Sequence, residues 1–210
     1  MQTLLLISSS RFLKNDLTNI LGKPLGSFKI GHVITASKGK GVSDLGYLDR
    51  TREIFRENNC DFEDVDVDGK DEVKLREILR KFDVVFVNGG STFYLLKAIR
   101  ESGFEKVLKE LLPQGLIYIG ASAGSYVACP TIEMSTWKHQ DKYEHYGITD
   151  FTAMNLVPFL MTVHYTLEYR DLLKEKIPTS SYPVKILNDD QAILVNDNEI
   201  TLLGGEEIIL

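Results

Sequence analysis

The sequence predicts an α/β fold: a three-layer sandwich whose central sheet is mostly parallel. Two observations carry this prediction. Apolar, strand-like runs alternate along the chain with amphipathic, helix-like runs, and the central strand-like runs are apolar at almost every position. Such alternation is typical of a parallel sheet, and continuous apolar strands indicate that helices cover both faces. Because we find no internal repeat, low-complexity tract or Pro/Gly/Ser-rich linker, we expect residues 1–210 to form one domain.

The first two thirds of the chain contain the runs on which this prediction depends. The expected strands cover residues 3–10, 28–37, 62–69, 83–90 and 116–124, and the expected helices cover 45–59, 71–82 and 91–115. The helix at 71–82 has apolar side chains at helical intervals, acids at its start and bases at its end, which suits the helix dipole. The strand at 62–69 alternates apolar residues with acids, as a half-exposed edge strand does. Ser91 and Thr92 favour a helix start, and Gly103 is expected to divide the last segment into two helices.

The last third of the chain is expected to add a strand, a helix and paired strands. An apolar strand is expected at 156–165 and a helix at 167–177. Residues 184–210 alternate apolar and polar positions between Asn, Asp and Gly turns, which predicts C-terminal β-hairpins. The segment 133–151 is polar and aromatic without a clean period, so we expect a long surface loop. Because it follows the candidate site described below, it could also cover that site as a flap.

Composition argues against several classes of function. The chain has 210 residues, a net charge of −6 and no basic run, which disfavours nucleic acid or an anionic membrane as the main partner. No apolar run approaches the roughly 20 residues of a membrane span, and the apolar N-terminal run is short and lacks a basic leader, so we expect a cytoplasmic protein. Cys60 and Cys129 share no motif spacing and are expected to be free thiols. Because no cluster of ligand residues has metal-binding spacing, we expect no metal and no cofactor.

The stretch IGASAGS, residues 119–125, is the strongest candidate for a reactive site. Ligands of an open parallel sheet bind beyond the carboxyl ends of the strands, and this stretch ends a buried strand. Its G-x-S-x-G pattern matches a nucleophile elbow, in which small neighbours let the hydroxyl of Ser122 project from a tight turn. The N–H of Ala123 would face an oxyanion, and the turn NGGS at 88–91 offers the N–H of Gly90 as a second donor. A plain strand-to-helix turn is the alternative for both stretches.

A serine nucleophile needs a base, and the chain has four histidines. His32 lies inside a strand-like run and is expected to be structural. His139 and His145 lie in the polar segment and are expected to be solvated. His164 ends the apolar strand at 156–165, which would place it at the carboxyl edge of the sheet. It is therefore the best-placed base, with a core histidine as the alternative.

The base in turn needs an orienting carboxylate. The candidates that follow the histidine in the sequence are Glu168, Asp171, Asp189 and Asp190. The first two lie on a helix-like run with basic neighbours and resemble a solvated face. The other two lie in the turn LNDDQAI, residues 187–193, where aspartates usually serve turn geometry. The residues alone leave this choice open.

These motifs occur together in a known family. The stretch VNGGSTFYLLK, followed by IGASAGSYVACPTI and by a histidine at the end of a later strand, resembles the serine peptidase family of peptidase E (aspartyl dipeptidase) and cyanophycinase. The resemblance covers most of the chain. It implies a fold like that of class I glutamine amidotransferases, which is flavodoxin-like, with serine in place of the usual cysteine. It also implies a Ser–His–acid triad, carried here by Ser122, His164 and Asp189.

The resemblance further implies a serine peptidase, an exopeptidase acting on dipeptides or short peptides. Peptidase E has a longer segment after the histidine, which ends in an arginine that recognises the substrate aspartate. Here the chain reads HYTLEYRD, so Arg170 is the equivalent that the resemblance offers for substrate binding. The alternatives are another acyl hydrolase (an esterase or amidase) on the same triad, and a non-catalytic binding module of the same fold. The expected partner is a small peptide substrate, and exposed sheet edges allow a homodimer.

Overall fold

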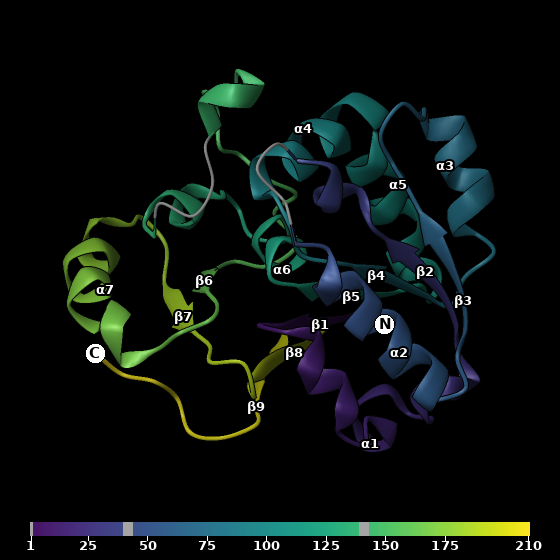
Figure 1. Ribbon diagram of the computed structural model, residues 1–210, viewed down its shortest axis with the longest axis horizontal. Helices are drawn as coiled ribbons and strands as arrows, with labels where there is room; N and C mark the ends of the chain where they lie inside the picture. Colours follow the sequence, from purple (N-terminus) through teal and green to yellow (C-terminus); the bar gives the residue numbers. More distant parts are fainter. Residues whose placement is uncertain (1, 40–43, 139–142) are drawn as a thin grey trace.

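The computed structural model describes residues 2–39, 44–138 and 143–210, and a seven-stranded sheet forms the centre of the described chain (Figure 1). The strand order is β3-β2-β4-β5-β1-β8-β9. The first five strands in this order are parallel to one another, and β8 is antiparallel to both of its neighbours, β1 and β9. The strands are β1 (Thr3–Ile7), β2 (Lys29–Val33), β3 (Asp61–Val65), β4 (Val84–Val87), β5 (Ile117–Ala121), β8 (Ala192–Asn196) and β9 (Glu199–Leu203). The predicted α/β class with a mostly parallel sheet is confirmed.

Helices cover both faces of this sheet. The helices of the described chain are α1 (Thr18–Leu21), α2 (Gly46–Glu57), α3 (Glu72–Leu79), α4 (Thr92–Ser102), α5 (Phe104–Leu111) and α6 (Ala123–Tyr126), with α7 (Arg170–Lys176) to one side of the sheet. Short 3-10 helices lie between them: η1 (Ser10–Lys14), η2 (Leu25–Ser27), η3 (Thr35–Lys38), η4 (Leu112–Gln114), η5 (Glu133–Thr136), η6 (Tyr143–Tyr146), η7 (Leu167–Tyr169) and η8 (Ile177–Thr179). The predicted break at Gly103 is observed, because this residue has φ +72° between α4 and α5.

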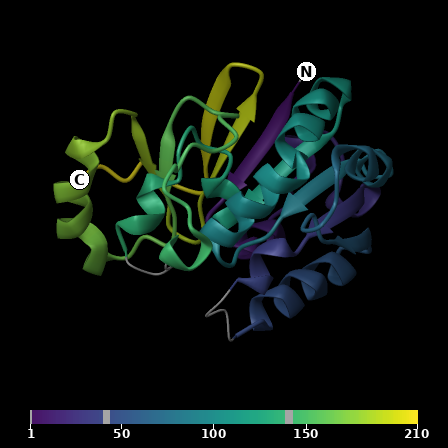
Figure 2. The same cartoon turned by 90° about the horizontal axis from the view of Figure 1, so that it is seen from above.

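Alternation along the strands produces the layers. In β1, Leu4 and Leu6 belong to the apolar cluster that contains side chains of α3, α4 and α5. Leu5 and Ile7 point to the other face, into the cluster formed with η1 and α2. Successive strand side chains project to opposite faces, so strands that are apolar throughout require cover on both sides. Figure 2 shows α2 on the opposite side of the sheet from the helices α4 and α5.

The strand that carries His164 is not part of the central sheet, and this part of our expectation was wrong. Only Leu160–Thr162 form a strand, β6, and it pairs in parallel with β7 (Val184–Ile186) in a separate two-stranded sheet. Figure 1 shows this pair and α7 to one side of the central sheet. Next to the elbow strand β5, β6 has no place to pair, because β5 lies between β4 and β1, and β1 is paired in turn with β8. Of the expected C-terminal hairpins, β8–β9 is confirmed, whereas β7 pairs with β6.

The segment 133–151 is less superficial than its polarity suggested. Met134, Trp137 and Ile148 are buried and belong to the large apolar cluster of the core. Short 3-10 helices, rather than one long helix, form in this segment. The sequence therefore has no regular helical period there, although its apolar side chains point inward. The described parts of the segment are therefore anchored in the core, and closure of a flap over the site remains a prediction.

Other expectations from composition can be compared with the described residues. Cys129 is buried, Cys60 is partly buried, and both are free thiols as expected. In the described parts of the chain, no helix has the length and apolar character needed to cross a membrane. Within those same ranges, no three His, Cys, Asp or Glu side chains are grouped so that they could hold a metal ion.

Candidate active site

Ser122 lies in a sharp turn between β5 and α6. Its backbone has φ +52° and ψ −109°, a combination that residues other than glycine rarely adopt. The N–H of Ser122 donates to the carbonyl of Ile7 on the adjacent strand β1, at 3.1 Å. Such strain persists only where the surrounding structure holds it, and a serine in this position presents its hydroxyl above the sheet edge.

The two glycines of the G-x-S-x-G motif are required by close packing. A Cβ atom on Gly124 would lie 2.0 Å from the carbonyl oxygen of Val87, and one on Gly120 would lie 2.6 Å from the carbonyl oxygen of Gly124. The turn is also held by hydrogen bonds. The hydroxyl of Tyr118 donates to the carbonyl of Gly124 at 2.6 Å, and that of Ser125 donates to the carbonyl of Gly120 at 2.6 Å. The motif is therefore a tightly packed elbow, and a side chain on either glycine would collide with backbone.

The structure brings Ser122, His164 and Asp189 into one chain of hydrogen bonds. His164 Nε2 lies 3.0 Å from Ser122 Oγ, and His164 Nδ1 lies 2.6 Å from Asp189 Oδ1. The side chains of His164 and Asp189 are 39% and 44% exposed, so solvent and a ligand can reach the pair. The hydrogen bond from His164 lowers the pKa of Asp189, while its partial burial opposes the shift. Asp189 is therefore ionised at neutral pH, and an ionised acceptor favours the proton of His164 on Nδ1.

Antiparallel pairing explains how Asp189 reaches this place. Ile7 at the end of β1 pairs with Ala121 at the end of β5 and with Ala192 at the start of β8. The turn that precedes β8 therefore lies at the same sheet edge as the elbow that follows β5. His164 enters from the separate sheet, with φ +54° in the left-handed region.

Ser8 is a member of this group that the sequence analysis missed. It is fully buried at the end of β1, its hydroxyl donates to Asp189 Oδ1 at 2.7 Å, and the backbone N–H of His164 donates to the same hydroxyl at 2.8 Å. The Ser8 side chain thus links the end of β1 to both His164 and Asp189. The sequence did contain one indication of this role, because Ser8 is a small polar residue at the carboxyl end of an expected central strand.

The backbone amides of Gly90 and Ala123 at this edge have no acceptor among the described residues. In the turn after β4, the N–H groups of Asn88 and Ser91 donate to backbone carbonyls, and that of Gly89 donates to Asn88 Oδ1. Gly90 and Ala123 carry the two donors that the sequence predicted for an oxyanion. The turn lies against the elbow, since a Cβ on Gly89 would be 3.2 Å from that of Ser122.

The other predicted residues lie apart from this group. Arg170 is exposed at the first position of α7, and within the described ranges its guanidinium has no hydrogen bond or ion pair. Among the described residues, no hydrogen bond or ion pair joins Arg170 to Ser122, His164 or Asp189. Asp190, the neighbouring candidate acid, pairs instead with Arg11 at 2.7 Å on the surface.

The remaining histidines and acids that the structure describes follow the expectations made for them. His32 is fully buried, His145 is exposed, and His139 lies outside the described residues. Glu168 and Asp171 are both exposed. Only His164 among the described histidines contacts the serine of the elbow.

A cation near the site, Lys138, was not predicted from the sequence. The ammonium of Lys138 donates to the carbonyl of Val163, next to His164 in the chain, and lies 4.4 Å from the centre of the Tyr169 ring. Partial burial lowers the pKa of Lys138 to about 8, and the charge of Asp189 opposes that shift. A lysine in the segment 133–151 thus adds positive charge beside the histidine.

The chain resembles known peptidases along most of its length. Residues 4–203 match the model of Peptidase family S51. An uncharacterized peptidase of Pasteurella multocida is 31% identical over 180 residues, which cover 84% of each chain. Peptidase E of Shewanella amazonensis is 28% identical, with 97% of this chain and 88% of the relative covered.

Solved structures show the same fold. The crystal structure of a candidate peptidase E protein from Listeria monocytogenes EGD-e has a TM-score of 0.83 at 24% identity, and 98% of this chain and 100% of that chain are covered. A peptidase from an acI-B1 actinobacterium has a TM-score of 0.71 at 13% identity, with 98% and 88% covered. The match of the family model over nearly the whole chain, together with these relatives, identifies the family: the chain belongs to Peptidase family S51, and its class of activity is that of a peptidase.

Proposed function

We propose that the protein is a serine-type exopeptidase that hydrolyses dipeptides or short peptides through Ser122, His164 and Asp189. One observation carries the proposal: His164 contacts Ser122 Oγ at 3.0 Å with one ring nitrogen and Asp189 at 2.6 Å with the other. A nucleophile within hydrogen-bond reach of a base, which a third group orients, is the arrangement that hydroxyl catalysis needs.

In the proposed reaction, Ser122 Oγ attacks the scissile carbonyl while His164 Nε2 accepts its proton. The carbonyl oxygen becomes an oxyanion, and the free N–H groups of Gly90 and Ala123 would donate to it. His164 then returns the proton to the leaving amine as the C–N bond breaks, which leaves an acyl group on the serine. Water adds to this ester with His164 again as the base, and the acid product and free serine are released. Asp189 stabilises the imidazolium that forms in each half of the reaction.

The same groups would also serve an esterase or an amidase, because the leaving group is selected by pocket residues outside the triad. Membership of a peptidase family favours a peptide substrate. The contacts disfavour a binding module without catalysis, because the proposed nucleophile, base and acid are all present and hydrogen-bonded in series.

The substrate side chain provides a first test. Arg170 is exposed and unpaired within the described ranges, so it does not form a buried pocket for an aspartate side chain. We therefore expect kcat/KM for Asp-Leu to lie within about tenfold of that for Ala-Leu, whereas a true aspartyl pocket should discriminate by about 100-fold or more. Steady-state kinetics on both dipeptides, with wild type and Arg170→Ala, decide the matter. A large Asp-Leu preference that vanishes in Arg170→Ala would contradict the expectation, and absence of hydrolysis of either would contradict the proposed function.

Ser8 provides a second test. Replacement with alanine removes the hydroxyl that donates to Asp189 and accepts from the His164 backbone. A hydrogen bond to a charged group contributes about 1.5–3 kcal/mol, so we expect kcat to fall roughly 10- to 100-fold while KM changes little. The neighbouring Ser9 is the matched control, because the one hydrogen bond of its hydroxyl within the described ranges is that accepted from the Arg11 N–H at the start of η1. Equal kcat values for Ser8→Ala and Ser9→Ala would show that the Ser8 contacts do not support the triad.

A further inference from the structure

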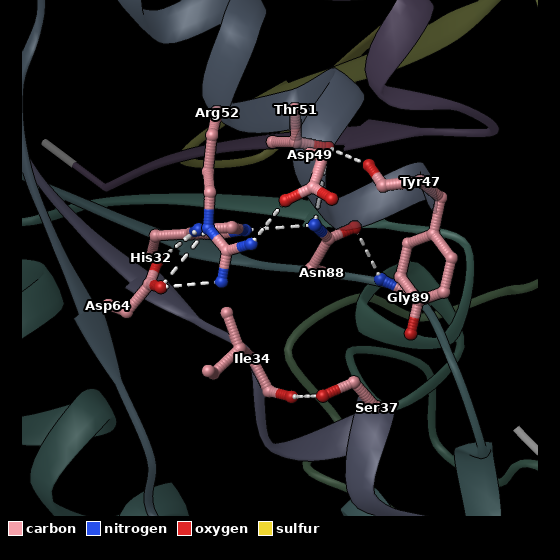
Figure 3. Close-up of polar contacts among 10 residues, drawn as sticks. All are labelled: His32, Ile34, Ser37, Tyr47, Asp49, Thr51, Arg52, Asp64, Asn88 and Gly89. Carbon is pink, nitrogen blue, oxygen red and sulfur yellow. Dashed lines mark hydrogen bonds and ion pairs between the residues drawn. The ribbon is translucent and has the colours of Figure 1, made fainter. Parts of the chain in front are cut away.

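A partly buried polar network, drawn in Figure 3, joins β3, β2 and the end of β4. In the sheet, β2 lies on the opposite side of β4 from the elbow strand β5. His32 on β2 is fully buried, and its Nδ1 lies 2.8 Å from Asp64 Oδ1 on the edge strand β3. Its Nε2 lies 2.8 Å from Asn88 Nδ2, at the end of β4. Arg52 on α2 binds the other oxygen of Asp64 through Nε at 3.2 Å and Nη2 at 2.7 Å. The network therefore runs from the surface of α2 to the turn that follows β4.

Hydrogen-bond chemistry fixes the direction of each bond in this network. The N–H of Gly89 is a donor, so the atom of the Asn88 side chain that it contacts at 2.7 Å is the oxygen. The amide nitrogen of Asn88 then faces His32 and can only donate, so His32 Nε2 is the acceptor. His32 consequently carries its proton on Nδ1 and donates it to Asp64.

The charges of the network agree with this assignment. Burial lowers the pKa of His32, although Asp64 opposes the shift, so the ring is neutral at neutral pH. The hydrogen bonds from His32 and Arg52 lower the pKa of Asp64 to about 2, so this carboxylate is ionised. A protonated His32 would present two donors, of which one would face the Asn88 amide without an acceptor. The neutral ring is thus the form that holds Asn88 in place.

This orientation determines which amide of the turn is available to a substrate. Asn88 Oδ1 occupies the Gly89 N–H, whereas the Gly90 N–H has no acceptor among the described residues. Gly90 has φ +133°, and a Cβ there would lie 2.5 Å from the carbonyl oxygen of Ala36, so the turn has little freedom to present another group. Thr51 Oγ1 accepts a weaker second bond from Asn88 Nδ2 at 3.2 Å.

We propose that His32 is a positioning residue for the oxyanion site: its neutral ring fixes the side chain of Asn88, which holds the Gly89 amide and leaves the Gly90 amide directed to the substrate oxygen. This inference rests on the proposed function and extends it to a residue that does not touch the triad. Without its bond to His32, the Asn88 side chain can rotate, and the Gly89 N–H is released from its acceptor. An oxyanion donor acts mainly in the transition state, so the loss should appear in kcat rather than in KM.

The test uses a fluorophosphonate probe, whose phosphonyl oxygen occupies the oxyanion site when it reacts with a serine nucleophile, together with hydrolysis of Ala-Leu. We expect Asn88→Ala and His32→Phe to lower the rate of covalent labelling and kcat by about 10- to 100-fold, with KM within about twofold of wild type. His32→Gln, which can still accept from Asn88 and donate to Asp64, should recover part of the loss. Ser102→Ala is the control, because in the part of the chain that the structure describes this buried hydroxyl on α4 bonds only within and next to its helix.

Amide hydrogen exchange separates positioning from general stability. We expect the Gly89 amide to be protected in wild type and in Ser102→Ala, and to lose that protection selectively in Asn88→Ala and His32→Phe. If His32→Phe fails to fold, Asn88→Ala still tests the link, because the His32–Asp64 contact remains intact in that variant. Folded variants with wild-type labelling rates and kcat would overturn this inference alone. A wild-type protein that neither reacts with the probe nor hydrolyses the dipeptide would overturn the proposed function, and this inference with it.

Discussion

Ser122→Ala is expected to lower kcat for dipeptide hydrolysis by about 10⁶-fold, the loss typical when the nucleophile of such a triad is removed. The fold should be retained, because the hydroxyl of Ser122 bonds only to His164 in the described chain and the alanine side chain is smaller. Steady-state kinetics on Ala-Leu, with circular dichroism and urea unfolding as checks of the fold, give the comparison. A folded variant that keeps more than a few per cent of the wild-type rate would exclude Ser122 as the nucleophile.

Gly124→Ala is expected to destabilise the protein by about 3 kcal/mol, the upper end of the usual cost of overpacking, because a clash with fixed backbone cannot be relieved by a side-chain movement. The added Cβ would meet the carbonyl oxygen of Val87 at 2.0 Å, in a strand that is paired on both sides. Gly124 lies in α6, where alanine is otherwise the better residue by about 1 kcal/mol, so a loss of stability measures the contact and not helix propensity.

Gly69→Ala is the matched control for this variant. Gly69 has φ +70°, but a Cβ there would meet nothing within 4 Å. The substitution should therefore cost only the strain of a left-handed backbone conformation, about 1–2 kcal/mol. Urea unfolding of both variants gives the free energies of unfolding. If Gly124→Ala is no less stable than Gly69→Ala, the conclusion that the elbow packs closely against β4 is wrong.

The features that could be predicted from the sequence are mainly local. The elbow at Ser122 combines a buried strand, two glycines at fixed spacing and a helix start, and each has its own signature in neighbouring residues. The turn after β4 and the division of 91–115 at Gly103 are of the same kind. These elements depend on packing and backbone conformation over a few residues, so the sequence contains the information directly.

The features that the residues alone left open, misplaced or missed depend on pairing between distant strands. Asp189 reaches the elbow only because β8 pairs antiparallel with β1, and the residues of the turn gave no reason to prefer it over Asp190. Ser8 was missed for the same reason, since its importance lies in the neighbours of β1 on both sides. His164 was expected at the edge of the central sheet, yet it reaches Ser122 from a separate sheet. Hydrophobic patterns indicate that a strand exists but not which partner it pairs with.

Mapping of the fluorophosphonate adduct tests the central claim most directly. Wild-type protein is treated with the probe, digested, and analysed by mass spectrometry to find the modified residue, with Ser122→Ala and His164→Gln treated in parallel. The proposed function predicts one adduct, on Ser122, that is absent in Ser122→Ala and forms far more slowly in His164→Gln. An adduct on another serine, or labelling that persists in Ser122→Ala, would contradict the assignment of the elbow serine as the nucleophile.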